Sequence, residues 1–530
     1  MAARKTTRKK TAPRKKAASA RKPAKAKKPA PRKVAASKRV ATKSAPKPAR
    51  KKAATPKKPA AKKAALRKTV ATRPATATSS PKQRAAKIDI ATLLDDLIAR
   101  ARKAGADGAD AVMFEGTSVS LGQRLGKPEK LERAEGHDLG LRVLVGKKQA
   151  IVSTTDTSPA MLTEIVERAL AMARSVPDDP YCGLADPAEL ARQIPTIDLD
   201  DASEPGTDLL KERARICEEA ALAVKGVTNS EGAEASWGRS SVTLVASNGF
   251  HGGYSGSRHS VGTAVLAGEG TGMERDYEYV SAVYGKDLED AAAVGRRAGE
   301  RAVKRLHPRK AATAKVPIVY DPRVSRGLVG HLAGAINGAA IARGTSFLKD
   351  KLGQRILPAD VAIIDDPHRP RGLNSKPFDG EGVANKKRSI IDKGVLTTWV
   401  LDLRSARQLG LKTTGHAARG TSSPPSPSLT NLYMTAGKLS PQAIIADIPS
   451  GFYVTELMGF GINGVTGDYS RGAAGFWIEH GELAYPVSEV TIAGNLNDMF
   501  LNLTPANDLE FRHGMDAPTV RVDGMTVAGV

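Results

Sequence analysis

The stretch "RGLVGHLAGAINGAAIARGTSF", residues 326–347, is rich in Gly and Ala and contains one histidine, His331, and no acid. The apolar segment "VPIVYD" (316–321) precedes it, so we predict a strand followed by a helix that includes residues 326–341. A metal-binding helix usually supplies its ligands in pairs about one turn apart. Because no second ligand accompanies His331, three interpretations stay open: a structural helix, the remains of a catalytic helix, or a protein whose site lies elsewhere.

Charge is distributed unevenly along the 530 residues. Residues 1–87 contain 32 of the 82 Lys and Arg, and no Asp or Glu precedes Asp89. The remainder therefore has 82 − 32 = 50 basic and 55 acidic residues, a net charge of −5. The chain is thus predicted to be a mildly acidic globular protein with a strongly basic tail.

The tail is a low-complexity mixture of Lys, Arg, Ala and Pro without aromatic residues. It cannot bury enough apolar surface to offset the entropy of ordering, so we predict that it is disordered. Its composition resembles linker-histone tails, and its cations would neutralise phosphates without reading sequence. A solubilising extension is the alternative. The candidate DNA or RNA contacts are Lys51, Lys52, Lys57, Lys58, Lys62 and Lys63.

The two cysteines, Cys182 and Cys217, form no disulfide framework, which fits a reducing cytoplasm. No apolar run approaches the 18–20 residues or so of a membrane span, and the basic N-terminus lacks the apolar core of a secretory signal. A mitochondrial transit peptide is disfavoured because prolines interrupt any amphipathic helix. We therefore expect a cytoplasmic protein without a membrane partner.

Periodicity predicts an α+β fold. Helices are expected from Asp89 to about Gly105, from Ser158–Pro159 onward, and over residues 207–225 and 287–306. Strands are expected around a turn at residues 146–148 and a hairpin at Asn248–Gly249, and mostly short strands are expected after residue 360. The predicted organisation is a tail (1–87), an N-terminal α+β domain (88–310) and a β-rich C-terminal domain (311–530).

Other motifs carry little chemistry. Gly459, Gly461 and Gly464 match G-x-G-x-x-G, but a turn and a strand are predicted to follow, so these are interpreted as loop glycines. No two histidines lie three to five residues apart, and no G-x-S-x-G is present. Asp379 and Glu381 are either a carboxylate pair or turn residues, and the turn is favoured. The residues alone therefore predict an α+β protein of undetermined activity.

Several longer stretches together resemble the TldD/PmbA family over about residues 88–530. They include residues 372–420, residues 464–496, "GHDLGLRVLVGKKQAIVST" and the terminal "PTVRVDGMTVAG". The resemblance implies a two-subunit metalloprotease that cleaves unfolded peptides, with family members also implicated in modulating DNA gyrase. One subunit type, TldD, carries a zinc helix with the motif H-E-x-x-x-H; the other, PmbA or TldE, lacks it.

Aligned on the segment Arg343–Ser346, the family's two zinc histidines fall on Val329 and Gly334, and its glutamate falls on Gly330. None of these residues offers a lone pair or carboxylate. The resemblance is therefore to the PmbA/TldE subunit. It implies that this chain binds no cofactor, while zinc belongs to a TldD-like partner in a hetero-oligomer.

Candidate contacts to the peptide or the partner follow from the same resemblance: His331, Asn337, Gly344, Thr345, Ser346, Asp379, Glu381, Gly461 and Asp468. The alternative function is a nucleic-acid-associated protein, acting in gyrase modulation or nucleoid tethering, with the globular part as an interaction module. A self-sufficient hydrolase with unrecognised catalytic groups is a third interpretation.

Overall fold

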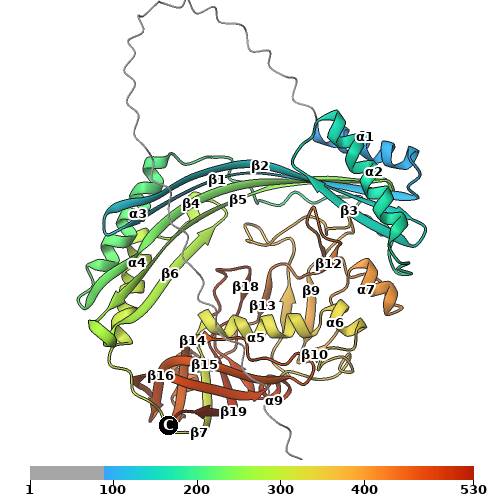
Figure 1. The fold of residues 1–530 in the computed structure, drawn as a ribbon. Helices are drawn as coiled ribbons and strands as arrows, with labels where there is room; N and C mark the ends of the chain where they lie inside the picture. Colours follow the sequence, from blue (N-terminus) through green and yellow to red (C-terminus); the bar gives the residue numbers. More distant parts are fainter. Residues whose placement is uncertain (1–88) are drawn as a thin grey trace, which may run out of the picture. The chain divides into compact units, whose positions relative to one another are not determined.

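The computed structural model of the chain describes residues 89–530. The predicted disorder of the basic tail and its predicted nucleic-acid contacts lie outside these residues. Within the described part of the chain, no helix is both long and apolar enough to cross a membrane. The described residues form an α+β structure with a β-rich C-terminal region, which confirms the predicted fold class (Figure 1).

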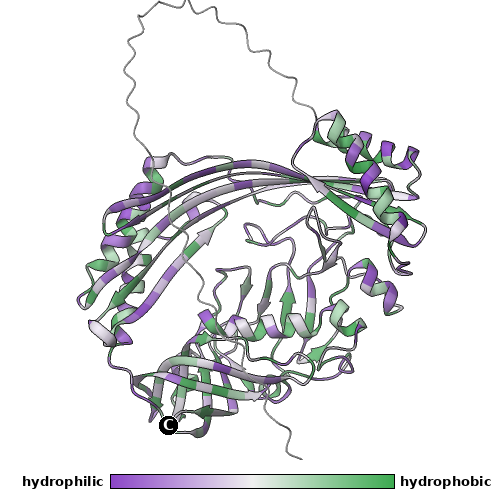
Figure 2. Cartoon of the chain, viewed as in Figure 1, coloured by the Kyte–Doolittle hydropathy of each residue, from purple (hydrophilic) through white to green (hydrophobic). Residues whose placement is uncertain are grey.

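The N-terminal half is built on one long, curved, six-stranded antiparallel sheet (Figure 1). Polar and apolar residues alternate along its strands, as expected for a sheet with two different faces (Figure 2). Its strand order is β3-β2-β1-β4-β5-β6. The strands are β1 (Gly108–Arg124), β2 (Lys127–Val145), β3 (Lys148–Thr154), β4 (Val227–Ala246), β5 (Phe250–Ala267) and β6 (Glu274–Ala282).

A pair of helices packs at each end of this sheet (Figure 1). Ser158 caps α2 by accepting from the backbone N–H of Met161, with proline in the first turn as predicted. In the other pair, a Cβ at Gly295 would overlap the carbonyl oxygen of Cys217, so glycine permits the close approach of the two helices. The helices are α1 (Ile90–Lys103), α2 (Pro159–Ser175), α3 (Thr207–Leu222) and α4 (Ala291–Lys304).

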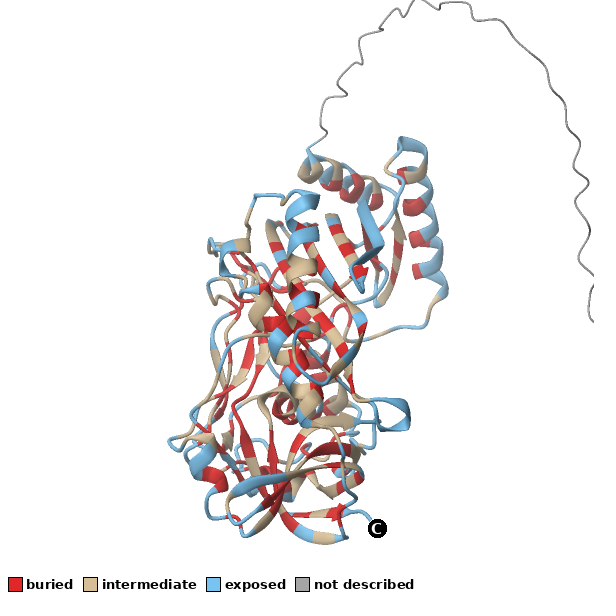
Figure 3. Cartoon of the chain, turned by 90° about the vertical axis from the view of Figure 1, so that its left-hand side faces the viewer, coloured by how far each residue is buried: buried red, intermediate tan, exposed pale blue. Residues whose placement is uncertain are grey.

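The C-terminal half lies on the concave side of the long sheet and contains two further sheets (Figure 1). One buried apolar cluster includes residues of both sheets and of helix α5 (Pro322–Ala335). Buried residues are red in Figure 3. One sheet has the order β10-β9-β8-β13-β18, and the other has the order β16-β15-β14-β7-β19-β17 with β16 also paired to β19.

The elements of these two sheets are mostly short. The first contains β8 (Ile363–Asp365), β9 (Arg388–Asp392), β10 (Val395–Leu396), β13 (Leu432–Met434) and β18 (Met515–Asp516). The second contains β7 (Ala314–Tyr320), β14 (Ser450–Met458), β15 (Asp468–Glu479), β16 (Glu482–Asn495), β17 (Leu503–Pro505) and β19 (Val520–Ala528). The remaining α-helices and strands are α6 (Gly338–Ala342), α7 (Leu403–Gln408), α8 (Pro441–Ile445), α9 (Leu496–Leu501), β11 (Ala417–Ala418) and β12 (Ser426–Pro427).

The predicted single helix over residues 326–341 is wrong in one respect: it is two helices, α5 and α6. The backbone N–H of Gly338 donates to the carbonyl of Val400 at 2.8 Å, which diverts it from the helical ladder. The side chain of Asn337 accepts from the N–H of Ala339 and caps α6. The first helix also begins earlier than residue 326, because Asp321 caps it and Pro322 occupies its first turn.

Loops of the C-terminal half contact the concave face of the long sheet directly. The ring of Phe378 meets that of Phe250 on β5 edge to face, with centroids 4.9 Å apart. A Cβ at Gly140 on β2 would overlap the backbone of Thr421. The backbone of the sheet and the backbone of the loop are therefore in direct contact at this point. The two halves thus share an interface in which a cavity remains.

Candidate functional site

The positions aligned with a zinc helix are on α5. Val329 is 1% exposed and belongs to the apolar core, so its side chain serves packing. Gly330 lies beside Met515, and no atom lies within 4 Å of a Cβ built on Gly334. These residues do not fit a zinc ion, because none has a ligating atom. Among residues 89–530, no group of three His, Cys, Asp or Glu side chains is placed to hold a metal.

His331 packs instead of ligating. Its ring meets that of Tyr469 on β15 edge to face, with centroids 5.9 Å apart. Burial lowers the pKa of His331, and the nearby charge of Arg471 lowers it further. A neutral imidazole against an aromatic ring is consistent with a structural contact between α5 and β15.

The segment after α6 and the loop between β14 and β15 lie side by side. The N–H of Phe347 donates to the carbonyl of Gly464 at 2.9 Å. Gly344 and Thr345 are exposed, whereas the buried Ser346 hydroxyl donates to the carbonyl of Ala335 at 2.5 Å. The loop spans residues 459–467 and is followed by a strand, as predicted for its glycines.

The β14–β15 loop presents an apolar surface. Phe460 in this loop is 97% exposed, and Val465 and Met458, the last residue of β14, are also exposed. At the loop's end, the Asp468 carboxylate accepts from Thr466 and from Asn495. Several exposed apolar side chains gathered in one place often mark contacts with other molecules.

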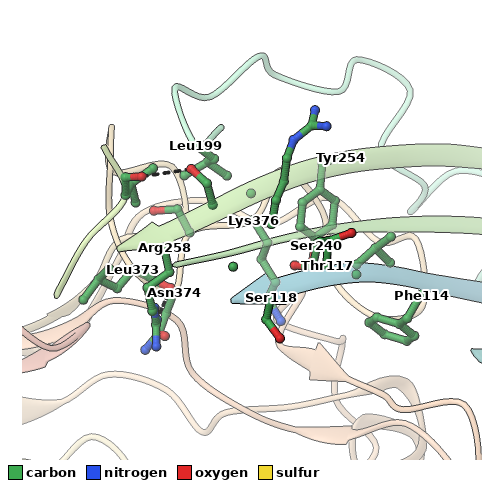
Figure 4. Close-up of a pocket in the computed structure, with 18 of the residues that line it drawn as sticks. Phe114, Thr117, Ser118, Leu199, Ser240, Tyr254, Arg258, Leu373, Asn374 and Lys376 are labelled. Carbon is green, nitrogen blue, oxygen red and sulfur yellow. Dashed lines mark hydrogen bonds between the residues drawn. The ribbon is translucent and has the colours of Figure 1, made fainter. Parts of the chain in front are cut away.

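A cavity of about 970 Å³ lies between the long sheet and the loops of the C-terminal half (Figure 4). Its volume is at the upper end of the range of about 300–1,000 Å³ that ligand pockets occupy. The sheet contributes Phe114, Ser118, Ser240, Tyr254 and Arg258, and the facing loops contribute Leu373, Asn374 and Lys376.

Strand register explains why the cavity exists. Gly116 on β1 pairs with Ser240 on β4, and Ser240 pairs with Gly256 on β5. Two residues along, Ser118 pairs with Gly238 in the same way. Since alternate residues share a face, these small residues form a patch where large side chains would otherwise fill the space. The patch therefore leaves space between this part of the sheet and the facing loops.

A buried network of charges joins the long sheet to the loops of the C-terminal half. On the long sheet, Arg142 donates through Nε to the Asp110 carboxylate at 2.8 Å. Arg419, from the C-terminal half, pairs with the same carboxylate. Burial would raise the pKa of Asp110, but the charges of the two arginines outweigh it and hold that pKa below its usual range.

Asp379 and Glu381 are both a buried acid pair and part of a turn. The Asp379 carboxylate accepts the backbone N–H groups of Glu381, Val383 and Ala417, and Glu381 accepts that of Leu403 at 2.9 Å. Burial raises the pKa of Glu381 to about 8, and the neighbouring Asp379 charge contributes. Burial also raises the pKa of Asp379.

The structure divides the candidate residues into two groups. The first lies around α5, α6 and the β14–β15 loop: Val329, Gly330, His331, Gly334, Asn337, Gly344, Thr345, Ser346, Gly461 and Asp468. The second group, Asp379 and Glu381, lies against the long sheet and its charge network. Sequence reasoning missed Lys376, Arg419 and the small-residue patch. The glycines and serines of the strands were the only available signal for the patch.

Comparison with known proteins shows which protein family the chain belongs to. The models of the PmbA/TldA metallopeptidase match in chain order: domain 1 over residues 109–173, the central domain over 200–306 and the C-terminal domain over 313–529. The chain therefore belongs to this PmbA/TldD family of metallopeptidases.

Relatives narrow the class to its PmbA branch. The metalloprotease PmbA of Escherichia coli O157:H7 is 41% identical over 425 residues, which cover 80% of this chain and 92% of that protein. A PmbA homologue of Haemophilus influenzae is 37% identical over 81% of this chain and 94% of its own length. The chain is thus PmbA-like, as the sequence resemblance indicated.

Solved structures share the fold. A Bacteroides thetaiotaomicron protein described as "a putative modulator of DNA gyrase" has a TM-score of 0.76 at 28% identity, and the match covers 83% of this chain and 98% of that one. TldE from Thermococcus kodakarensis has a TM-score of 0.75 at 21% identity, and the match covers 82% of this chain and all of the other. The second likeness concerns the fold alone.

Proposed function

We propose that this chain is the zinc-free subunit of a two-subunit peptidase that degrades or processes unfolded peptides in the cytoplasm. A TldD-like partner would carry the zinc, the attacking water and the general base. The observation that carries the proposal is α5, whose positions Val329, Gly330 and Gly334 have no ligating atom where the family's zinc helix has its motif. A chain of this family without its own ligands needs another chain to hydrolyse a peptide.

This chain would contribute binding surfaces rather than the bond-breaking groups. The cavity between the sheet and the loops is lined by small polar residues, by the aromatic rings of Phe114 and Tyr254, and by the cations Arg258 and Lys376. Such a mixed lining offers apolar surface and polar contacts to a peptide segment. The exposed apolar loop at Phe460, beside α6, supplies a surface for the partner subunit.

The decisive experiment is a peptidase assay on an unstructured fluorogenic peptide with this chain, a TldD-like chain, and the two co-expressed. We expect activity only when both are present, and no stoichiometric zinc in this chain purified alone. Activity or one equivalent of zinc in the isolated chain would instead support a self-sufficient hydrolase. No activity in any combination would overturn the peptidase assignment.

A second function is favoured by the 32 Lys and Arg and the absence of acid in residues 1–87. Such a tail would retain the protein on DNA or RNA through phosphate contacts, and a gyrase-related or nucleoid-tethering role would follow. The relative named as a gyrase modulator is consistent with this idea. Deleting residues 1–87 should abolish salt-sensitive DNA retention. Equal retention of the truncated protein would exclude a tail-based function.

A further inference from the structure

A small pocket of about 120 Å³ opens beside the large cavity, and both share Phe114, Val242, Tyr254 and Lys376. Its remaining walls include Val112, Leu244 and Phe378, so most of its lining is apolar. A space of about 150 Å³ accommodates a benzene-sized group, so this pocket suits one apolar side chain. The pocket is therefore a side chamber of the cavity proposed above to hold peptide.

Arg419 enters this apolar pocket with unused hydrogen-bond donors. Its side chain is 2% exposed, and one terminal nitrogen pairs with Asp110. The Nε and Nη2 groups contact no acceptor among residues 89–530. Buried donors are nearly always satisfied, because an unsatisfied one costs about 1–3 kcal/mol. Two such donors on one guanidinium match the two oxygens of a carboxylate.

Lys376 supplies a second cation to the same pocket. Its Nζ donates to the carbonyl of Ala417 at 3.1 Å, which leaves further N–H groups of the ammonium free to donate. Burial lowers the pKa of Lys376, although the charges of Asp379 and Asp365 oppose this. Asp365 is itself engaged by Thr430 and His416. Lys376 therefore lies between the cavity and the pocket with part of its hydrogen-bonding capacity unused.

The carboxylates near the pocket are engaged elsewhere. Asp110 pairs with Arg142 and with the other terminal nitrogen of Arg419. Asp379 accepts three backbone N–H groups. Within residues 89–530, neither carboxylate therefore reaches the Nε or Nη2 group of Arg419, which are left to bind an acceptor from another molecule.

We propose that Arg419 and Lys376 form a subsite for a carboxylate that a peptide chain carries next to an apolar side chain. The carboxylate would bind the free donors of Arg419 and Lys376, while the side chain fills the apolar pocket between Val112 and Phe378. A C-terminal apolar residue presents this combination, and so does an acidic residue beside an apolar one. This inference rests on the proposed peptide-binding role and adds which peptide groups are recognised.

The test uses the full chain and calorimetric titration with three acetylated hexapeptides of Gly and Ser that end in leucine. One has a free C-terminus, one is amidated, and one is amidated with aspartate before the leucine. We expect the free acid to bind about 10- to 100-fold more tightly than the plain amide, the effect of losing a charged hydrogen bond. Tight binding of the aspartate peptide as well would extend the subsite to acidic side chains. Equal affinity of all three, or no binding, would overturn the proposal.

Substitutions test whether Lys376 and Arg419 cause the preference for the free-acid peptide. Lys376→Met and Arg419→Gln should each reduce the preference for the free acid to less than about threefold. Lys387→Met is the matched control: it removes an exposed lysine that pairs with Asp366 and lies outside the lining of both cavities. A preference retained by both pocket variants would contradict the assignment. If Arg419→Gln fails to fold in a thermal scan, the three peptides on the unaltered chain still decide the outcome.

These results are independent of the peptidase assay. Carboxylate-dependent binding without activity in the co-expressed pair would leave the subsite standing and overturn the peptidase role. Activity in the co-expressed pair, together with equal binding of the acid and amide peptides, would support the peptidase role and overturn the subsite.

Discussion

Arg419, from the C-terminal half, and Asp110, from the long sheet, form an ion pair whose side chains are 2% and 3% exposed. Arg142 shares the same carboxylate from the neighbouring strand. The pair therefore joins the two halves of the described chain beside the cavity. The stability of the fold should therefore depend on Asp110, because this one carboxylate compensates the charges of two buried guanidinium groups.

Replacing Asp110 by asparagine should destabilise the fold strongly. Two buried cations would lose their counter-charge, and breaking a buried pair in this way typically costs about 3–5 kcal/mol. The free energy of unfolding in urea measures the effect. The control is Asp96→Asn, which breaks the exposed Arg100–Asp96 pair on α1 and should cost no more than about 0.5 kcal/mol. Similar losses in both variants would show that the buried pair has no special weight.

Glu381 should make the stability depend on pH. Its pKa is about 8 in the folded chain against an ordinary value of 4.5, so folding favours the protonated form. The contribution is therefore complete below about pH 4.5 and is lost as the pH rises through about 8. Glu381→Gln stays neutral and keeps an acceptor for the N–H of Leu403. Unfolding in urea at about pH 5, 7 and 9 should show a smaller decline for the variant than for the unaltered chain. Parallel declines would contradict the raised pKa.

Local signals explain which parts of the fold could be predicted from the sequence. Ser158 and Pro159 start a helix through contacts within one turn, and Asn248–Gly249 forms a hairpin through its own backbone preference. The break before Gly338 could not be predicted, because it depends on the carbonyl of Val400, far along the chain. Non-local hydrogen bonds of this kind have no signature in a window of sequence.

In the candidate site, too, local features could be predicted from the sequence and non-local ones could not. Asp379 and Glu381 stood out because two acids share a glycine-rich loop, and the structure places them together. The burial of Lys376 and Arg419 could not be predicted, since basic side chains are usually exposed. The small-residue patch combines Gly116 with residues on strands more than a hundred positions later, and only strand register aligns them. Chemistry that depends on such alignment becomes visible in three dimensions alone.

The glycines of α5 and α6 should respond oppositely to alanine. Gly334 lies in the last turn of α5 with no atom within 4 Å of a new Cβ, so Gly334→Ala should stabilise the chain by about 0.5–1 kcal/mol. At Gly338 a Cβ would lie 2.6 Å from both Leu401 and Ser405, so Gly338→Ala should destabilise it. Thermal unfolding compares the two. A loss of stability in Gly334→Ala would contradict the finding that no atom lies within 4 Å of a Cβ at this position.

The exposed loop should matter for assembly and not for folding. Phe460 is 97% exposed, so Phe460→Ser should leave the unfolding midpoint unchanged. If the loop contacts a TldD-like partner, burying this ring in the interface would contribute about 1.5–3 kcal/mol, and the variant should bind the partner roughly tenfold or more weakly. Sedimentation or surface-immobilised binding measures this. Leu131→Ser is the control, because it removes another exposed apolar side chain, on β2. Unchanged affinity in both variants would exclude the loop from the interface, whereas equal losses would show an effect of general surface hydrophobicity.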